Sequence, residues 1–209
     1  MPDLPGSTLS PFTAADGENL AVRDWPLTGG ERRGTVLLVH GLGEHTGRYA
    51  ALVRRLNGWG FAVRGHDHYG HGESGGPRGG LTSDMRLEDD LAGVIGATRA
   101  RMRPGEPLVL LGHSMGGLVA ARLVARGLGP VDALVLSSPA LAAFLNPVQK
   151  LLLATLPRLA PNLRVGNGLN PEYLSHDAAV VAAYRADPLC HDRISARLAR
   201  YIADGGPGP

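Results

Sequence analysis

Four short apolar runs that alternate with helical patterns constrain the fold of this chain most. Each run is apolar on consecutive positions, which is typical of a strand buried on both faces of a parallel sheet. The runs are Thr35–Val39, Phe61–Val63, Leu108–Leu111 and Val131–Leu136, and the helical patterns between them are Tyr49–Trp59, Asp84–Arg103 and Met115–Arg126. Because parallel strands are joined by right-handed crossovers, the alternation predicts an α/β fold with a mostly parallel, doubly wound sheet.

The first residues predict an antiparallel addition to this sheet. Ser10–Thr13 and Leu20–Trp25 flank an Asp16-Gly17 turn signal. Two apolar segments around such a turn are typical of a hairpin. We expect this hairpin at one edge of the sheet.

The alternation breaks after Ser138, where a different pattern begins. Prolines punctuate this part of the chain, and the expected helices are Leu141–Leu156, Ala178–Arg185 and Ile194–Ala203. We therefore predict an α/β core over residues 1–138, an inserted helical cap over 139–192, and the start of a return to the core over 193–209. No strand pattern follows, so the sheet to which the cap returns is expected to be incomplete.

Composition excludes several classes of function. The 209 residues carry 21 basic and 19 acidic side chains, a net charge of +2 without a basic face for nucleic acid. Cys190 is the single cysteine, so no intrachain disulfide can form. With no apparent signal peptide or spanning apolar segment, we expect a cytoplasmic protein with no cofactor. Oligomeric state is left open.

The segment Gly112–Gly116, which reads Gly-His-Ser-Met-Gly, lies between the third apolar run and a helix. A strand, a sharp turn and a helix are the setting of a nucleophilic serine. Gly112 and Gly116 leave room for close backbone packing while the turn exposes the Ser114 hydroxyl. His113 lies in the same turn, and the Met115 N–H at the helix start can donate to an oxyanion.

A second oxyanion donor is expected from the loop after the first apolar run. That loop, His40–His45, is rich in glycine and includes Gly41. The backbone N–H of Leu42 is our candidate donor. We expect His40 and His45 to orient the loop and not to act as bases.

Three blocks in this order carry a family resemblance: His40–Tyr49, Asp67–Gly75 and Gly112–Gly117. With these blocks the chain resembles the monoacylglycerol lipases, a group that includes bacterial proteins labelled lysophospholipase or serine aminopeptidase-like hydrolase. Tyr173–Asp177 and Asp187–Leu189 are similar to segments of that family's cap. The resemblance implies an α/β-hydrolase fold with an inserted helical cap. It further implies a serine hydrolase that cleaves carboxylic esters of the monoacylglycerol or lysophospholipid type, small-molecule acyl esters, through an acyl-Ser114 intermediate.

The chain departs from that family in its last part. In the family, the triad Asp comes after a later strand and the His lies in the loop after the final strand, and we expect both positions to lie beyond residue 209. The last two strands of the fold are then missing, and this chain is expected to be nearly inactive. The cap region does contain candidate acids and bases, but they match non-catalytic family positions: Asp177, Asp187, Asp192, His176 and His191.

Two other functions remain open on sequence. His66, His68 and His71, with Asp67, have a spacing that metal sites use, although Gly70 stands where a metallo-β-lactamase-type motif places an aspartate. We assign no metal ligands. Alternatively, the protein is a non-catalytic acyl-binding or relic member of the fold.

The apolar run Leu151–Leu153 offers a peripheral membrane contact through the cap, or a contact with an acyl substrate. Its helical spacing favours packing inward instead.

Overall fold

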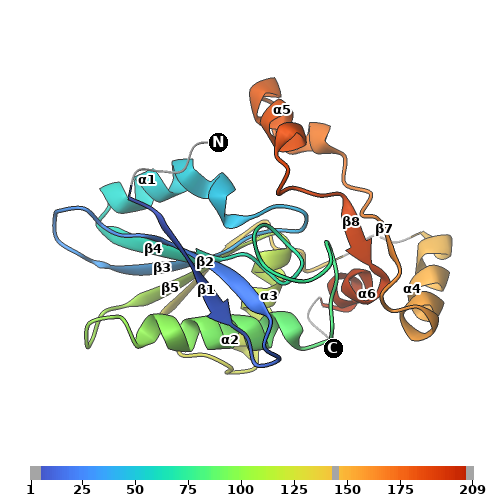
Figure 1. Ribbon diagram of the computed structural model, residues 1–209, viewed down its shortest axis with the longest axis horizontal. Helices are drawn as coiled ribbons and strands as arrows, with labels where there is room; N and C mark the ends of the chain where they lie inside the picture. Colours follow the sequence, from blue (N-terminus) through green and yellow to red (C-terminus); the bar gives the residue numbers. More distant parts are fainter. Residues whose placement is uncertain (1–5, 143–145, 206–209) are drawn as a thin grey trace.

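A computed structural model of the protein describes residues 6–142 and 146–205. Its main sheet has six strands in the order β1-β2-β4-β3-β5-β6 (Figure 1). The strands are β1 Thr8–Thr13, β2 Asn19–Trp25, β3 Gly34–Val39, β4 Phe61–His66, β5 Leu108–His113 and β6 Ala133–Ser137. Strands β4, β3, β5 and β6 run parallel to one another, as the alternation predicted.

The hairpin prediction is confirmed: β1 pairs antiparallel with β2, and β2 joins β4 antiparallel. Strand β3 lies at the centre, where all six of its residues are buried. Its Val36 is aligned with Val63 of β4 and Val109 of β5. Continuous apolar character is therefore explained by burial from both faces.

Helices cover the two faces of the sheet (Figure 1). On one face, α1 (Ala50–Gly58) packs Val53 and Leu56 against β3 and β4. On the other face, α2 (Arg86–Arg99) and α3 (Met115–Ala125) enclose the larger core cluster. These three helices match the predicted positions, and the 3-10 helix η1, Thr46–Tyr49, precedes α1.

Strand β6 forms one edge of the sheet and pairs only with β5 among the described strands. Most of its residues are exposed, including Val135 and Leu136. In contrast with β3, this apolar strand is covered only in part by the described residues, because Leu134 packs against the larger core cluster while Val135 and Leu136 are exposed.

The cap segment, which we define as residues 146–195, follows β6 and is helical with one short ladder. It contains α4 Pro147–Leu159, β7 Arg164–Gly166, η2 Pro171–Tyr173, α5 Ala178–Ala186 and β8 Arg193–Ser195, and α6 Ala196–Asp204 follows it. The two-stranded ladder of β7 and β8 was not predicted because three-residue strands leave almost no periodic signal. Leu198 and Tyr201 of α6 then pack into the larger core cluster.

The start of the first cap helix was predicted wrongly. Helix α4 begins at Pro147 because Asn146 and Gln149 form a capping box and proline suits the first helical position. Leu141 and Ala142 are not helical, and residues 143–145 lie outside the described residues. The helix also continues through Pro157 and ends at Leu159. Proline has no N–H, so Pro157 removes one hydrogen bond of the helix, close to its end.

The expectation that Leu151–Leu153 packs inward is wrong for its first two residues. Leu151 is 65% exposed and Leu152 is 46% exposed. Helix α4 contacts mainly α6, and the side of α4 that carries Leu151 and Leu152 is left uncovered by the described residues. None of the described helices has both the length and the apolar character needed to cross a membrane.

Candidate active site

Ser114 occupies a strained turn between β5 and α3. Its φ of 52° and ψ of −119° lie outside the ordinary regions for a residue with a side chain. The turn is held from both sides, because Ser114 N–H donates to Ser137 O and Ala140 N–H donates to Ser114 O, each at 3.0 Å. The backbone after β6 thus fixes the conformation that brings the serine to the carboxyl end of β5.

The glycines of this turn allow backbone to pack on backbone. A Cβ on Gly112 would lie 2.5 Å from Gly116 O, and a Cβ on Gly116 would lie 2.3 Å from Val39 O. Both distances are far shorter than any real Cβ contact. The start of α3 therefore rests directly on the end of β3, as expected for these glycines.

The loop after β3 meets the serine turn. A Cβ on Gly41 would lie 3.2 Å from Ser114 Cβ, so the two segments touch. Gly41 N–H donates to Glu44 Oε1 at 2.7 Å, and the Tyr49 hydroxyl donates to the same oxygen at 2.6 Å. Through this carboxylate, the loop that carries Leu42 is joined to the start of α1.

The two amides expected as oxyanion donors lie in these touching segments. Neither Leu42 N–H nor Met115 N–H donates a hydrogen bond to another of the described residues. Leu42 is half-buried, whereas Met115 is buried with its amide at the first turn of α3. Both groups are thus available to an acceptor beside Ser114.

The histidines near Ser114 form hydrogen bonds with groups other than its hydroxyl. His40 Nδ1 donates to Gly41 O at 2.7 Å, and its Nε2 accepts from His68 N–H at 2.9 Å. His113 Nδ1 lies 3.1 Å from both the carbonyl and the hydroxyl oxygen of Ser137. Among the described residues, no histidine is hydrogen-bonded to the Ser114 hydroxyl.

Among the described residues, the ring nitrogens of His66, His68 and His71 belong to no group of three potential ligand atoms within 4.8 Å of one another. The oxygens of Asp67 accept from the backbone of Thr46 and Glu73 and so brace two loops. Burial lowers the pKa of His66 to about 3 and that of His68 well below its ordinary value, so both rings are neutral.

The cap segment contacts the loop of Leu42, which the sequence analysis did not anticipate. His191 N–H donates to Gly43 O at 3.0 Å, and the Tyr184 hydroxyl donates to the same carbonyl at 3.1 Å. Asp187, rejected as a catalytic residue on sequence, pairs with His45 at 2.9 Å. Asp177 caps α5 through Ala179 N–H. On sequence, Asp177, Asp187 and His191 are candidates only as acids or bases or as parts of cap segments, and nothing indicates a contact with this loop.

Comparison with known proteins identifies the family of the chain. A protein-family model described as "Serine aminopeptidase, S33" matches residues 30–207. The chain belongs to this S33 family. The match includes β3 to β6, the serine turn and the cap segment, so it extends over most of the described fold.

Two relatives of the chain carry lipase names. The chain is 40% identical over 173 residues to "Monoacylglycerol lipase" of Mycolicibacterium smegmatis, covering 81% of this chain and 61% of that protein. It is 38% identical over 193 residues to human "Monoglyceride lipase", covering 89% of this chain and 61% of that protein. The chain therefore spans about three fifths of the length of these relatives.

A solved structure shows the same fold. The monoacylglycerol lipase of Paleococcus ferrophilus superposes with a TM-score of 0.76 at 39% identity, over 90% of this chain and 69% of that one. The α/β-hydrolase fold predicted from the three sequence blocks is thereby confirmed.

The packing of α3 on β3 gives a matched test. We expect Gly116→Ala to lower the free energy of unfolding by ~2 kcal/mol or more, because its Cβ would overlap the Val39 carbonyl. Gly96→Ala in α2 is the control, since a Cβ there meets nothing within 4 Å and alanine favours helix by ~1 kcal/mol. Urea denaturation followed by circular dichroism measures both. Similar stability changes in the two variants would contradict the packing argument.

The buried histidines predict a loss of stability in acid. The folded state keeps His66 neutral, while the unfolded state takes up a proton below its ordinary pKa of 6.5. The unfolded state thus binds more protons than the folded state between pH 6.5 and about 3. The free energy of unfolding is therefore highest above pH 6.5, and it decreases as the pH is lowered, by up to about 1.4 kcal/mol per pH unit for each such proton.

Urea titrations at pH 7 and pH 5 measure this loss. We expect His66→Gln to reduce the pH dependence, and exposed His176→Gln to leave it unchanged. If His66→Gln retains the full dependence of the wild type, this histidine is not its source.

Proposed function

We propose that this chain carries the nucleophile and oxyanion donors of a serine hydrolase that cleaves carboxylic esters. The observation that carries the proposal is the strained turn of Ser114, held at the carboxyl end of β5 beside two unengaged backbone amides. Such strain persists only where surrounding structure enforces it, and it is typical of functional sites. Membership of the S33 family supports the same assignment.

The proposed chemistry follows from the positions of these groups. The Ser114 oxygen attacks the ester carbonyl carbon, and the resulting oxyanion accepts from Leu42 N–H and Met115 N–H. Collapse of the tetrahedral intermediate breaks the bond to the alcohol oxygen, and the alcohol takes up, through solvent, the proton that the Ser114 hydroxyl has lost. Water then hydrolyses the acyl-Ser114 ester to the carboxylic acid and the free serine. His40, Gly41, Gly112, His113 and Gly116 form the surrounding loops and bring the two donors to the serine.

The proposed substrate is a small acyl ester of the monoacylglycerol or lysophospholipid type. The support is the monoacylglycerol lipase name of two relatives at about 40% identity, one of them with a solved structure of the same fold. No cofactor enters this reaction.

The proposal includes slow turnover by the 209-residue chain. Both nitrogens of His40 are engaged, and no other described histidine is hydrogen-bonded to the Ser114 hydroxyl. A serine without a base keeps its proton, and triad removal leaves only ~10³–10⁴-fold catalysis over water. The lack of a described histidine that is hydrogen-bonded to Ser114 also favours an alternative function, an acyl-binding protein without turnover.

Acylation of a cysteine at position 114 tests the oxyanion donors without requiring a base. A thiol is partly ionised at neutral pH, so Ser114→Cys should form a stoichiometric butyryl adduct with p-nitrophenyl butyrate. Ser138→Cys is the matched control, since Ser138 also has a positive φ, of 43°, but lies outside the two touching loops. Peptide mass spectrometry locates the adduct, and we expect faster acylation at position 114 than at 138.

Steady-state hydrolysis separates the alternatives. We expect wild type and Ser114→Ala to hydrolyse p-nitrophenyl butyrate at the same near-background rate. Turnover that disappears in Ser114→Ala would show that a base acts within this chain. Equal acylation of the two cysteine variants would refute the proposed oxyanion donors.

We also propose that α4 contacts an anionic lipid surface. Leu152 and Leu159 are seven residues apart and therefore on one side of the helix, and Leu159 is 82% exposed. The exposed cations Lys150 and Arg158 lie on the other side of the helix, where they line a pocket with Arg200 of α6, and the exposed Arg164 follows the helix. An exposed apolar side with cations on the polar side is typical of helices that bind at a membrane interface.

Co-sedimentation with vesicles tests this contact. Wild type should bind vesicles that contain phosphatidylserine more strongly than neutral vesicles, and the double variant Leu152→Ser, Leu159→Ser should lose most of that binding. Trp59→Ser, at the end of α1 and 58% exposed in the wild type, is the control for loss of apolar surface elsewhere. Equal binding by the double variant and the wild type would exclude α4 as the contact.

A further inference from the structure

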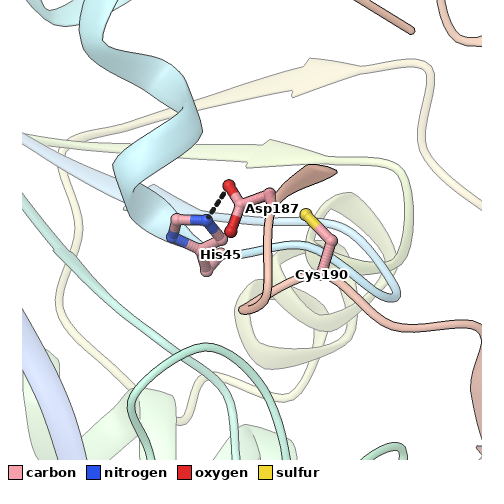
Figure 2. Close-up of side chains that lie close together, drawn as sticks. All are labelled: His45, Asp187 and Cys190. Atoms are coloured by element: carbon pink, nitrogen blue, oxygen red, sulfur yellow. Dashed lines mark hydrogen bonds and ion pairs between the residues drawn. The ribbon is translucent and has the colours of Figure 1, made fainter. Parts of the chain in front are cut away.

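A histidine, an aspartate and a cysteine come together away from Ser114, where the cap segment meets the loop after β3 (Figure 2). His45 precedes η1, Asp187 ends α5, and Cys190 lies in the next turn. One ligand atom from each lies within 4.8 Å of the other two. This is the sole such group of three among the residues that the structure describes.

Backbone hydrogen bonds orient the two cap residues. Cys190 N–H donates to Asp187 O at 3.1 Å, and Leu189 N–H donates to Asp187 Oδ1 at 3.0 Å. The resulting turn points the Cys190 sulfur back toward the carboxylate, beside His45 (Figure 2). The other carboxylate oxygen, Oδ2, faces His45 Nε2 at 2.9 Å.

The two segments are also held together without these side chains. Gly43 O accepts from His191 N–H and from the Tyr184 hydroxyl. His45 is 8% exposed and Asp187 is 15% exposed at their side chains. A cavity of about 440 Å³, lined in part by His45, Asp187 and Leu189, adjoins the group. The arrangement is therefore largely preformed, and solvent can reach it.

We propose that His45, Asp187 and Cys190 bind a zinc-type divalent cation that joins the cap segment to the loop of Leu42. Sulfur, imidazole and carboxylate are the three ligand types of protein zinc sites, and a water from the cavity would supply the fourth. The sulfur and nitrogen donors disfavour magnesium and calcium, which prefer oxygen ligands. This site is separate from the proposed ester hydrolysis, because none of its ligands contacts Ser114.

Several features limit the affinity. Cys190 must lose its proton to bind the cation as a thiolate, which costs free energy. The positive charge of Arg48 also lies close to the sulfur and repels a bound cation. His45 Nδ1 accepts from Gly47 N–H at 3.2 Å, and coordination through Nε2 places the ring proton on Nδ1, so this contact must be given up. The Asp187–His45 hydrogen bond must also open to admit the cation. We therefore expect weaker binding than at a four-ligand structural zinc site.

Cobalt(II) is the probe, because its bond to a thiolate gives a charge-transfer band and tetrahedral coordination gives intense visible bands. The purified 209-residue chain is titrated with cobalt chloride after treatment with a chelator, and zinc is then added in competition. Wild type should show both spectral features, and zinc should abolish them.

Three variants and a control identify the ligands. Cys190→Ser should lose the charge-transfer band, and Asp187→Asn and His45→Gln should weaken cobalt binding ~10-fold or more. Asp192→Asn is the control, since this neighbouring carboxylate is exposed and outside the group, and it should titrate as wild type. Circular dichroism verifies that each variant folds. If His45→Gln does not fold, Cys190→Ser and Asp187→Asn are enough to test the proposal.

The absence of a thiolate band in folded wild type would overturn the proposal. Equal cobalt affinity in wild type, Cys190→Ser and Asp187→Asn would do the same. Because the measurement is spectroscopic and leaves Ser114 unchanged, its outcome is independent of the proposed esterase chemistry.

Discussion

The contact of α3 with the end of β3 is the constraint on which the candidate site depends. It places the backbone of Gly116 against the Val39 carbonyl, which no side chain at that position would permit. Strand β3 is the central strand, so this contact ties the serine turn to the most buried element of the fold. The loop of Leu42 begins where β3 ends and therefore arrives beside Ser114. Geometry that rests on backbone contact and a buried strand is rigid, which is what an oxyanion site requires.

The parts of the fold that could be predicted from sequence have strong periodic signals. Strand β3 is six consecutive buried residues, and α2 buries Leu87, Leu91 and Val94 at helical spacing, so neither pattern has a competing interpretation. The weak predictions lie in the cap segment. There, the start of α4 depends on a capping box at Asn146, and β7 and β8 have only three residues each. Local capping and long-range pairing decide these boundaries, and neither has a period to detect.

The same distinction applies to the site. Ser114 and the two glycine-rich loops are contiguous in sequence, so a motif with its flanking elements was enough to find them. The pairing of His45 with Asp187 joins residues 142 positions apart, and it depends on where α5 ends. Without the fold, Asp187 is one acidic residue among 19 in the chain. The contact between the cap segment and the Leu42 loop is thus a property of the tertiary structure alone.

The order of strands has a consequence for how the chain folds as it is synthesised. Strand β3 pairs with β4, which follows soon after it, and with β5, which ends at His113. Some 70 residues, including all of α2, must therefore leave the ribosome before the second side of the central strand is paired. Pairings between such distant segments slow folding and leave apolar strands uncovered in the meantime. The nascent chain thus passes through a stage in which its central strand has one open edge, and this stage ends only when the segment that carries the serine turn has emerged.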